Sequence, residues 1–430
     1  MRQKLIVLSA DALVYEDVEQ LRNMPNYKKY LEGGCRVKKV RSIYPTITYP
    51  CHTTMRTGVW PEKHGVFGNF ELEPGTERVT WKWYQKSVKW DEDIFKAAKR
   101  AGLTTCSIFW PMTGNNTDID YLIDECWPLQ GEEFDREVYR KSGSSEEMLD
   151  IMESQWQDCK SRSHPGQDEF LMRCAREVIL RHQPDLLVVH PGNVDKYRHQ
   201  NGVFNDRVSK GVEEVDGFIG TLMKAVEDAG LSDCTNFVLT SDHGQIDIKR
   251  VMAPNVLLAD AGLIDVDENG KIVNWKAYCH SGGTSAIVYL KNPDDKEIYD
   301  QTWKVLKKAE EEGIYGFRKV FTEAEAREKY HLGGDFAFVL ETDGFTSFKD
   351  SAIRPMMSTY DLSDYRYGKA THGHVPEFGP QPIFSAKGPA FRENVTIETA
   401  NLVDEAPTYA KVLGMELRDA DGRVLEEFLR

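Results

Sequence analysis

The sequence lacks several features that would place it in a specialised class. No apolar run in its 430 residues approaches the ~20 residues that a membrane span needs. The eight cysteines are scattered without a CxxC pair, so we expect reduced, buried thiols rather than a disulfide framework. Positive charge is scarce: 54 Lys and Arg stand against 69 Asp and Glu, a net charge of −15. This balance argues against a binder of nucleic-acid polymers or of anionic membranes.

The N-terminus also lacks the pattern of a signal peptide. The apolar piece at 5–8 is short, and Asp11 follows it closely, so we interpret it as a first strand and expect a cytoplasmic protein. Hydrophobic residues make up 40% and charged residues 29% of the chain, as in soluble globular proteins. The length suits one large α/β domain with insertions, or two domains.

Short apolar runs alternate with amphipathic segments, and no internal repeat is visible. This alternation predicts an α/β fold with a doubly wound, mostly parallel sheet. We expect 1–250 and 351–430 to form this core and 251–350 to form a small α+β insert, while the polar stretch 131–167 is predicted to be irregular. The expected core strands are 4–9, 103–109, 186–189 and 237–240, and the expected core helices are 168–182 and 205–229.

The stretch 44–55, Tyr-Pro-Thr-Ile-Thr-Tyr-Pro-Cys-His-Thr-Thr-Met, combines a hydroxyl with a helix start. Pro50 suits a first helical turn, and Gly58 can end a helix over 52–57. Thr48 would then lie just before the helix, among backbone N–H groups without intrahelical partners, where anions bind. A hydroxyl in that place can attack a phosphoryl or sulfuryl group once its proton is removed.

Acidic residues follow three of the predicted strands. Asp11, Asp195 and Asp242 each come shortly after a strand, and His243 adjoins the last of them. Because the carboxyl ends of strands in an open α/β sheet face one crevice, these groups should gather at one edge. Asp195 and His199 have i, i+4 spacing, which puts both side chains on one face of a helical turn.

The same residues suit a pair of metal ions. His372, in a Thr-His-Gly-His loop, adds a further ligand, and a set of Asp and His without Cys suits zinc or another borderline divalent ion. Two ions about 4 Å apart could share phosphoryl transfer: one would lower the pKa of the Thr48 hydroxyl and the other would bind the leaving-group oxygen.

Each residue taken alone also has an ordinary structural interpretation. An Asp at a strand end is more often a turn or capping residue, and a lone His is more often on the surface or satisfied in the core. The hypothesis of a two-metal site therefore depends on the co-occurrence of these groups. Arg198, between two of the expected ligands, is predicted to face solvent.

Several segments together resemble a known family. The stretch 44–54, with 57–69 (Thr-Gly-Val-Trp-Pro-Glu-Lys-His-Gly-Val-Phe-Gly-Asn), closely resembles the nucleophile segment of nucleotide pyrophosphatase/phosphodiesterases, in the alkaline phosphatase superfamily. The later segments in the family's order are 108–111, 195–199, 241–244, 371–373 and 386–389. The resemblance covers most of the chain except about 130–165 and 251–350, and it implies an alkaline-phosphatase-like fold.

The resemblance also implies roles for individual residues. Thr48 is the expected nucleophile, and Asn69 with the Tyr49 backbone N–H is expected to hold a non-bridging phosphoryl oxygen. One zinc ion is expected on Asp195, His199 and His372, and the other on Asp11, Asp242, His243 and the Thr48 oxygen. The implied reaction is the hydrolysis of nucleotide-like or other small phosphodiesters by two in-line displacements through a phospho-threonine. The sequence leaves the oligomeric state open.

Two other functions fit the same residues. A phosphomonoesterase, or a phosphonate hydrolase similar to phosphonoacetate hydrolase, could use the same threonine and metals, but a dianionic substrate would need a nearby Arg or Lys that the sequence does not place. A non-catalytic, metal-stabilised binding protein is the third alternative. The family pattern is also not complete, because Cys51 stands where an asparagine is usual. The sulfatase branch resembles this chain less, because 51–56 lacks the CxPxR spacing.

Overall fold

An eight-stranded sheet forms the centre of the molecule. The computed structural model describes residues 2–76, 79–126, 134–156, 159 and 163–430. The strand order in the sheet is β19-β2-β18-β6-β1-β5-β3-β4. Only β18 runs antiparallel to its two neighbours, so the sheet is mostly parallel, as predicted. The strands are β1 (Lys4–Ser9), β2 (Cys35–Arg41), β3 (Thr105–Ile108), β4 (Tyr121–Ile123), β5 (Leu186–Val189), β6 (Thr235–Thr240), β18 (Phe384–Lys387) and β19 (Thr396–Asn401).

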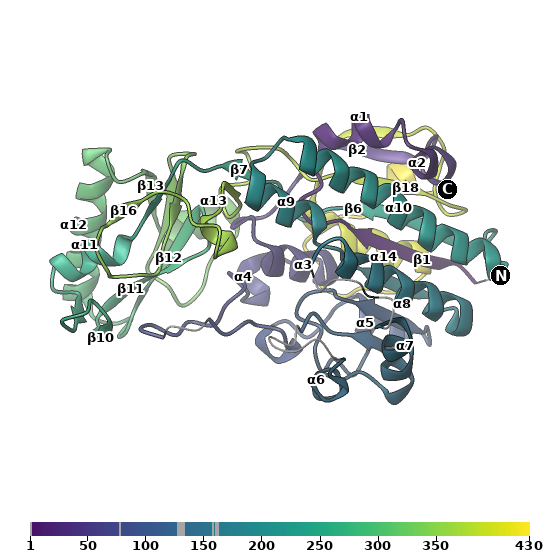
Figure 1. Cartoon of the computed structure of the whole chain (residues 1–430), viewed down its shortest axis with the longest axis horizontal. Helices are drawn as coiled ribbons and strands as arrows, with labels where there is room; N and C mark the ends of the chain where they lie inside the picture. The colour runs from purple at the N-terminus through teal and green to yellow at the C-terminus, as the bar shows by residue number, and fades with distance from the viewer. Residues whose placement is uncertain (1, 77–78, 127–133, 157–158, 160–162) are drawn as a thin grey trace.

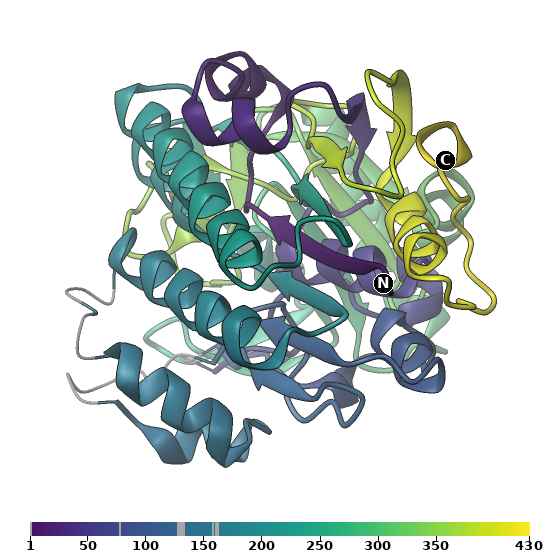
Figure 2. The same ribbon diagram turned by 90° about the vertical axis from the view of Figure 1, so that its right-hand side faces the viewer.

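Helices cover both faces of this sheet (Figure 2). Alternate side chains of β1 enter two separate cores: Leu5 and Val7 belong to one, and Ile6 and Leu8 to the other. The core with Ile6 includes α2 (Pro25–Tyr30), α7 (Glu146–Trp156), α8 (Gly166–His182) and α10 (Asp206–Asp228), and the core with Leu5 includes α3 (Thr48–Thr57), α5 (Ile94–Arg100) and α14 (Glu405–Leu413). The doubly wound α/β architecture predicted from the sequence is therefore confirmed.

A four-stranded antiparallel sheet lies at the end of the molecule opposite the N-terminus (Figure 1). Its order is β11-β12-β14-β13, and its own hydrophobic core contains side chains of the neighbouring helices. It falls within the range 251–350 predicted for the insert. The elements are β11 (Ala277–Ser281), β12 (Ser285–Leu290), β13 (Phe317–Thr322), β14 (Phe338–Thr342), α11 (Pro254–Asp260), α12 (Lys296–Glu312) and α13 (Glu323–Tyr330).

The remaining elements are mostly short and lie outside the two main sheets. The remaining strands are β7 (Ile246–Asp247), β8 (Arg250–Met252), β9 (Ile264–Val266), β10 (Ile272–Trp275), β15 (Thr346–Phe348), β16 (Met357–Ser358) and β17 (Ala370–Thr371). The remaining α-helices are α1 (Val18–Leu21), α4 (Pro61–His64), α6 (Arg136–Lys141) and α9 (Asn193–Asn201). Among the described residues, no helix combines the length and the apolar character needed to cross a bilayer.

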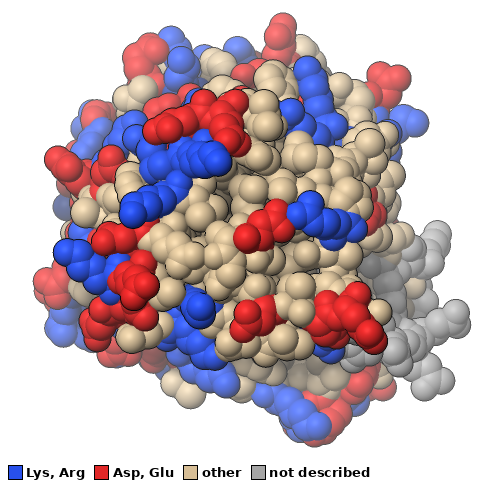
Figure 3. Space-filling view, turned by 90° about the vertical axis from the view of Figure 1, so that its left-hand side faces the viewer, with Lys and Arg blue, Asp and Glu red and all other residues tan. Residues whose placement is uncertain are grey.

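The end of the molecule that carries the four-stranded sheet has a mixed surface. Lys and Arg side chains are interspersed with Asp and Glu side chains over this face, with uncharged areas between them (Figure 3). Polyanion-binding surfaces present a field of one sign. The face in view therefore does not resemble a polyanion-binding surface.

The prediction that 131–167 is irregular is wrong over much of its length. Helices α6 and α7 lie there, and α7 buries Met148, Leu149, Ile151 and Met152 in the core on one side of the main sheet. The acidic and polar residues between these apolar positions concealed the helical spacing. Residues 131–133, 157–158 and 160–162 of this range lie outside the described residues.

Candidate active site

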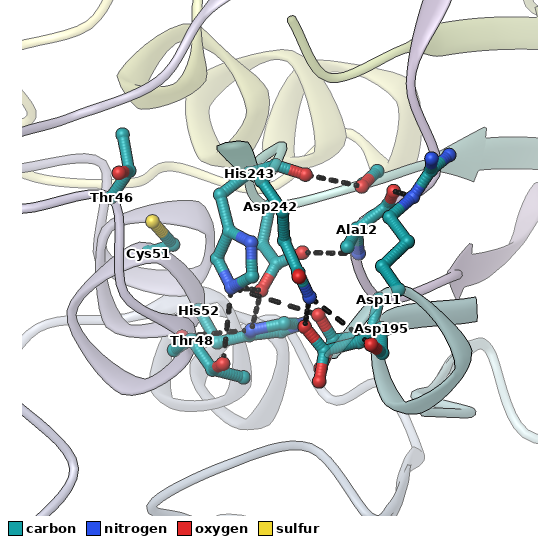
Figure 4. Close-up of polar contacts among 12 residues, drawn as sticks. Asp11, Ala12, Thr46, Thr48, Cys51, His52, Asp195, Asp242 and His243 are labelled. Atoms are coloured by element: carbon teal, nitrogen blue, oxygen red, sulfur yellow. Dashed lines mark hydrogen bonds and ion pairs between the residues drawn. The ribbon is translucent and has the colours of Figure 1, made fainter. Parts of the chain in front are cut away.

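Thr48 is the first residue of α3. The sequence predicted Thr48 just before a helix with Pro50 in its first turn and 52–57 in its body, but the first turn already includes Thr48 and follows Ile47 in an extended conformation. Pro50 fits inside the first turn because an N–H there has no intrahelical partner. Gly58 ends the helix in the left-handed region with φ of 72°, as predicted. The Thr48 hydroxyl oxygen lies 3.1 Å from His243 Nε2 (Figure 4).

The first cluster of possible ligands comes from the adjacent parallel strands β1 and β6. Asp11 follows β1, while Asp242 and His243 follow β6. His243 Nε2 lies 3.1 Å from Asp242 Oδ2 and 3.6 Å from Asp11 Oδ1. The two strands end side by side, so their loops bring three ligand groups to the Thr48 hydroxyl (Figure 4).

The second cluster adjoins the first. Asp195 and His199 lie one turn apart on α9, with His199 Nε2 3.1 Å from Asp195 Oδ2, and His372 follows β17. The His372 ring lies 4.1 Å from the His243 ring between centroids and 5.2 Å from the His199 ring. The structure thus brings together all seven residues for which the sequence predicted metal binding: six form two neighbouring groups, and the seventh, Thr48, lies beside the first group.

Unpartnered buried atoms show that these groups suit cations. Asp11 Oδ1, Asp242 Oδ2, His199 Nε2 and His372 Nδ1 are buried and make no hydrogen bond. His199 donates its Nδ1–H to the Ala370 carbonyl at 2.7 Å, which turns Nε2 toward the Asp195 carboxylate. A cation, either a proton or a metal ion, is needed between Nε2 and that carboxylate, and a histidine anchored to the backbone in this way is the usual form of a metal ligand. The donor sets of two carboxylates with one His, and of one carboxylate with two His, fit zinc.

The electrostatics within the site also favour a bound cation. Burial, followed by the nearby Asp195 and Asp242 carboxylates, raises the pKa of Asp11 well above its usual value. Burial opposes ionisation of Asp195 as well, but His199, together with His372 and His243, outweighs burial and holds the pKa of this carboxyl below its usual range. A divalent cation would remove the repulsion that favours protonation of Asp11.

Asn69 and the Tyr49 N–H are neighbours, but they also bond to each other. The Tyr49 N–H donates to Asn69 Oδ1 at 3.0 Å, and Asn69 Nδ2 donates to the Tyr365 hydroxyl at 3.1 Å. All three residues line one cleft together with Thr48. A phosphoryl oxygen that used the Tyr49 N–H would therefore replace the Asn69 oxygen as its partner.

Sequence reasoning missed several residues at the site. Gln245 donates to Asp195 Oδ1 at 2.5 Å, and His190 lies with Nε2 3.3 Å from Asp11 Oδ2. His190 directly follows β5, so the strand-end rule that identified Asp11 could have found it. Other cleft residues that were not predicted are Trp81, Phe109, Glu125, His164, Gln167, Lys196 and Tyr365. No local pattern marks these, because separate segments of the chain, both loops and helices, bring them to the cleft.

Arg198 was predicted to face solvent, and this prediction is wrong. Its side chain is fully buried, forms an ion pair with Asp17 at 2.5 Å, and donates to the carbonyl oxygens of Ala12 and Val203. The bond to Ala12 ties α9 to the loop that carries Asp11. The charge of Arg198 alone does not indicate that its side chain joins α9 to the Asp11 loop.

Removing the Arg198 charge should destabilise the fold. Arg198→Met would leave the Asp17 carboxylate buried without its cation, which costs about 3–5 kcal/mol of unfolding free energy. Urea denaturation followed by circular dichroism would measure the loss. Arg181→Met, at an ion pair whose arginine is 52% exposed, should cost less than about 1 kcal/mol. Equal losses in the two variants would contradict a structural role for the buried pair.

The chain is similar to known proteins over most of its length. The family model described as "Type I phosphodiesterase / nucleotide pyrophosphatase" matches residues 5–361. Human ectonucleotide pyrophosphatase/phosphodiesterase family member 1 is 27% identical over 254 residues, which are 56% of this chain but only 24% of that relative. Bis(5'-adenosyl)-triphosphatase enpp4 of Xenopus laevis is 23% identical over 424 residues, 96% of this chain and 78% of the relative.

Solved structures show the same fold. Murine ectonucleotide pyrophosphatase/phosphodiesterase 5 superposes with a TM-score of 0.67 at 20% identity, covering 99% of this chain and 100% of that one. An inactive threonine-to-alanine variant of the same murine protein, in complex with AMP, gives a TM-score of 0.68 at 20% identity, with 100% of both chains covered. At this identity the likeness establishes the architecture that presents the two ligand clusters.

Proposed function

The chain belongs to the type I phosphodiesterase/nucleotide pyrophosphatase family, and on that premise we propose that it hydrolyses nucleotide-like or other small phosphodiesters. The observation that carries the proposal is the position of the Thr48 hydroxyl, 3.1 Å from His243 Nε2, beside two clusters whose buried ligand atoms lack partners. A hydroxyl at a helix start, next to two possible cation sites, suits attack on an anionic phosphoryl group.

The chain's own residues account for most of the proposed reaction. Thr48 Oγ attacks phosphorus in line, and the bond from phosphorus to the leaving-group oxygen breaks. The resulting phospho-threonine is then hydrolysed by water in a second displacement. The Tyr49 N–H and the Asn69 amide, which line the cleft beside Thr48, would donate to a non-bridging oxygen as its charge grows.

We propose that two divalent cations, in the first instance zinc, complete the site. Asp11, Asp242, His243 and the Thr48 oxygen would hold one ion, and Asp195, His199 and His372 would hold the other. Bound there, the ions would lower the pKa of the Thr48 hydroxyl and neutralise charge on the leaving group. Gln245 would keep the Asp195 carboxylate in position through its bond to Oδ1.

Phosphodiesters should be better substrates than phosphomonoesters. The donors beside Thr48, the Tyr49 N–H and the Asn69 amide, are neutral and suit the single charge of a diester. We expect kcat/KM for bis-p-nitrophenyl phosphate to exceed that for p-nitrophenyl phosphate at least ~10-fold, about 1.4 kcal/mol of transition-state discrimination. Release of p-nitrophenol by the zinc-loaded protein measures both. A preference for the monoester would support the phosphomonoesterase alternative, and turnover of phosphonoacetate would support the C–P hydrolase alternative.

The binding-protein alternative makes a different prediction. It requires metal binding without turnover of any of these substrates, whereas the proposed enzyme requires both. The cytoplasmic location expected from the sequence stays a prediction, which the distribution of the protein between cell fractions would test.

A further inference from the structure

A tyrosine hydroxyl extends the row of polar groups beside Thr48. Tyr365 lines the same cleft as Thr48, and its hydroxyl accepts from Asn69 Nδ2 at 3.1 Å. Asn69 Oδ1 in turn accepts from the Tyr49 N–H at 3.0 Å. Two hydrogen bonds therefore join the Tyr49 N–H, the Asn69 amide and the Tyr365 hydroxyl along one wall of the cleft. The family match ends at residue 361, before the tyrosine that completes this row.

The hydroxyl proton of Tyr365 is left for a ligand. A phenol is protonated at neutral pH and offers one donor and two lone pairs. The bond from Asn69 uses one lone pair, so the proton of Tyr365 points away from Asn69. In the part of the chain that the structure describes, no group accepts this proton. An oxygen atom of a substrate is the acceptor that the cleft can receive.

The ring of Tyr365 is held by the aromatic side chains around it. Its centroid lies 5.2 Å from that of His199, 5.8 Å from that of His372 and 6.0 Å from that of Trp81. The ring thus packs against two histidines of the second ligand cluster, while its hydroxyl reaches the Asn69 amide. The position of the hydroxyl is therefore fixed relative to that cluster.

The backbone that carries Tyr365 is also fixed. Tyr365 begins the short 3₁₀ helix η3 (Tyr365–Tyr367), and the next residue, Arg366, is buried and pairs with Asp350 at 2.7 Å. The Arg366 carbonyl accepts from the Ser347 hydroxyl of β15 at 2.6 Å. Donors that are in place before a substrate binds stabilise a transition state well, because they need no reorganisation during the reaction.

We propose that Tyr365 is a further catalytic residue, whose hydroxyl donates to a non-bridging phosphoryl oxygen while Thr48 attacks. The inference rests on the proposed hydrolase function. The bond from Thr48 Oγ to phosphorus forms as the bond to the leaving-group oxygen breaks, and Tyr365 keeps its proton throughout. Its hydrogen bond strengthens as charge gathers on the oxygen in the transition state. The donor is neutral, like the Tyr49 N–H and the Asn69 amide, and so suits the single charge of a diester.

Removing only the hydroxyl tests this role. In zinc-loaded protein, Tyr365→Phe keeps the ring against the ligand histidines and should lower kcat for bis-p-nitrophenyl phosphate about 10²-fold, as expected for the loss of one oxyanion donor. Elemental analysis should find the metal content of the unaltered protein. Tyr367→Phe is the matched control, because it removes a phenol hydroxyl from the same turn outside the cleft; it should keep kcat within a few fold.

A double-mutant cycle separates donation to the substrate from the positioning of Asn69. If Tyr365 acted only by orienting Asn69, Tyr365→Phe would have no further effect in an Asn69→Ala background. Direct donation predicts a further loss of kcat of at least ~10-fold in that background. Calorimetric binding of orthovanadate, which adopts the five-coordinate geometry of the transition state, gives a readout without turnover. Tyr365→Phe should raise its Kd at least ~10-fold, with and without Asn69→Ala.

Four results would overturn the inference. They are an unchanged kcat in Tyr365→Phe, no further loss in the Asn69→Ala background, a loss of bound metal in Tyr365→Phe, and an equal loss of kcat in Tyr367→Phe. Failure of the unaltered, zinc-loaded protein to hydrolyse any phosphodiester would instead refute the proposed function.

Discussion

Thr48→Ala is expected to lower kcat for bis-p-nitrophenyl phosphate at least ~10³-fold, because it removes the group that forms the covalent intermediate. Residual turnover would come from binding and electrostatic groups that remain, such as the Asn69 amide. The loss should appear in kcat more than in KM, since the hydroxyl makes its new bond only in the transition state. The remaining ligand atoms of both clusters come from other residues, so the variant should still bind metal. Steady-state kinetics and elemental analysis on the same preparation measure both quantities.

Two further variants make this prediction specific. Thr48→Ser keeps a hydroxyl at the start of α3 and should recover much of the activity lost by the alanine variant. Thr53→Ala removes a hydroxyl one to two turns later on the same helix, where it donates to the Tyr49 carbonyl at 2.7 Å outside the cleft. It should keep kcat within a few fold of the unaltered protein. Undiminished turnover by Thr48→Ala would show that another group is the nucleophile.

The main sheet could be predicted because its central strands are short, continuous and apolar. The strand at 186–189 has the predicted bounds, since turn residues delimit it on both sides. The strands β2 and β19 were not predicted. Strand β19 forms one edge of the sheet and β2 lies next to it, and both mix polar or charged residues with apolar ones, a pattern that resembles loop or helix as much as strand.

The ligand clusters could be located because parallel topology converts sequence position into spatial position. Asp11 and Asp242 are 231 positions apart, yet the pairing of β1 with β6 puts their loops side by side. The cleft wall could not be predicted in this way. His164 and Glu125 reach it from loops whose path depends on packing, and loop paths have no periodic signal in a sequence.

The prediction for Arg198 was wrong because its position, too, is set by packing and not by the topology of the sheet. On a short helix with two polar faces, the sequence does not show which face meets the protein, and an arginine is exposed more often than not. Here α9 is enclosed by the Asp11 loop and by Asp17, so the guanidinium is needed to neutralise a buried carboxylate. The burial of this charge depends on tertiary contacts, and the sequence of one helix does not reveal those contacts.

Loss of one cluster should remove one metal ion and most of the activity. The unaltered protein is expected to bind two divalent ions per chain, and His199→Ala one, because the ring supplies the Nε2 that faces Asp195. We expect kcat/KM for bis-p-nitrophenyl phosphate to fall at least ~10³-fold, about 4 kcal/mol of transition-state stabilisation. His331→Ala is the control, because His331 is a half-exposed residue that stacks on Trp60 and lies outside both clusters. Two ions in His199→Ala, with full activity, would contradict the assignment.

Metal binding should also stabilise the fold, in a way that depends on pH. Ions that bind only the folded chain raise Tm. Since burial and then the Asp195 and Asp242 carboxylates raise the pKa of Asp11, protons compete with the ion for this carboxyl. The metal-free fold prefers protonated Asp11, so its stability from this group is lost as pH rises through the folded pKa, whereas the metal-bound fold gains. The difference in Tm between zinc-loaded and chelator-treated protein should therefore shrink as pH falls, and a difference independent of pH would argue against Asp11 as a ligand.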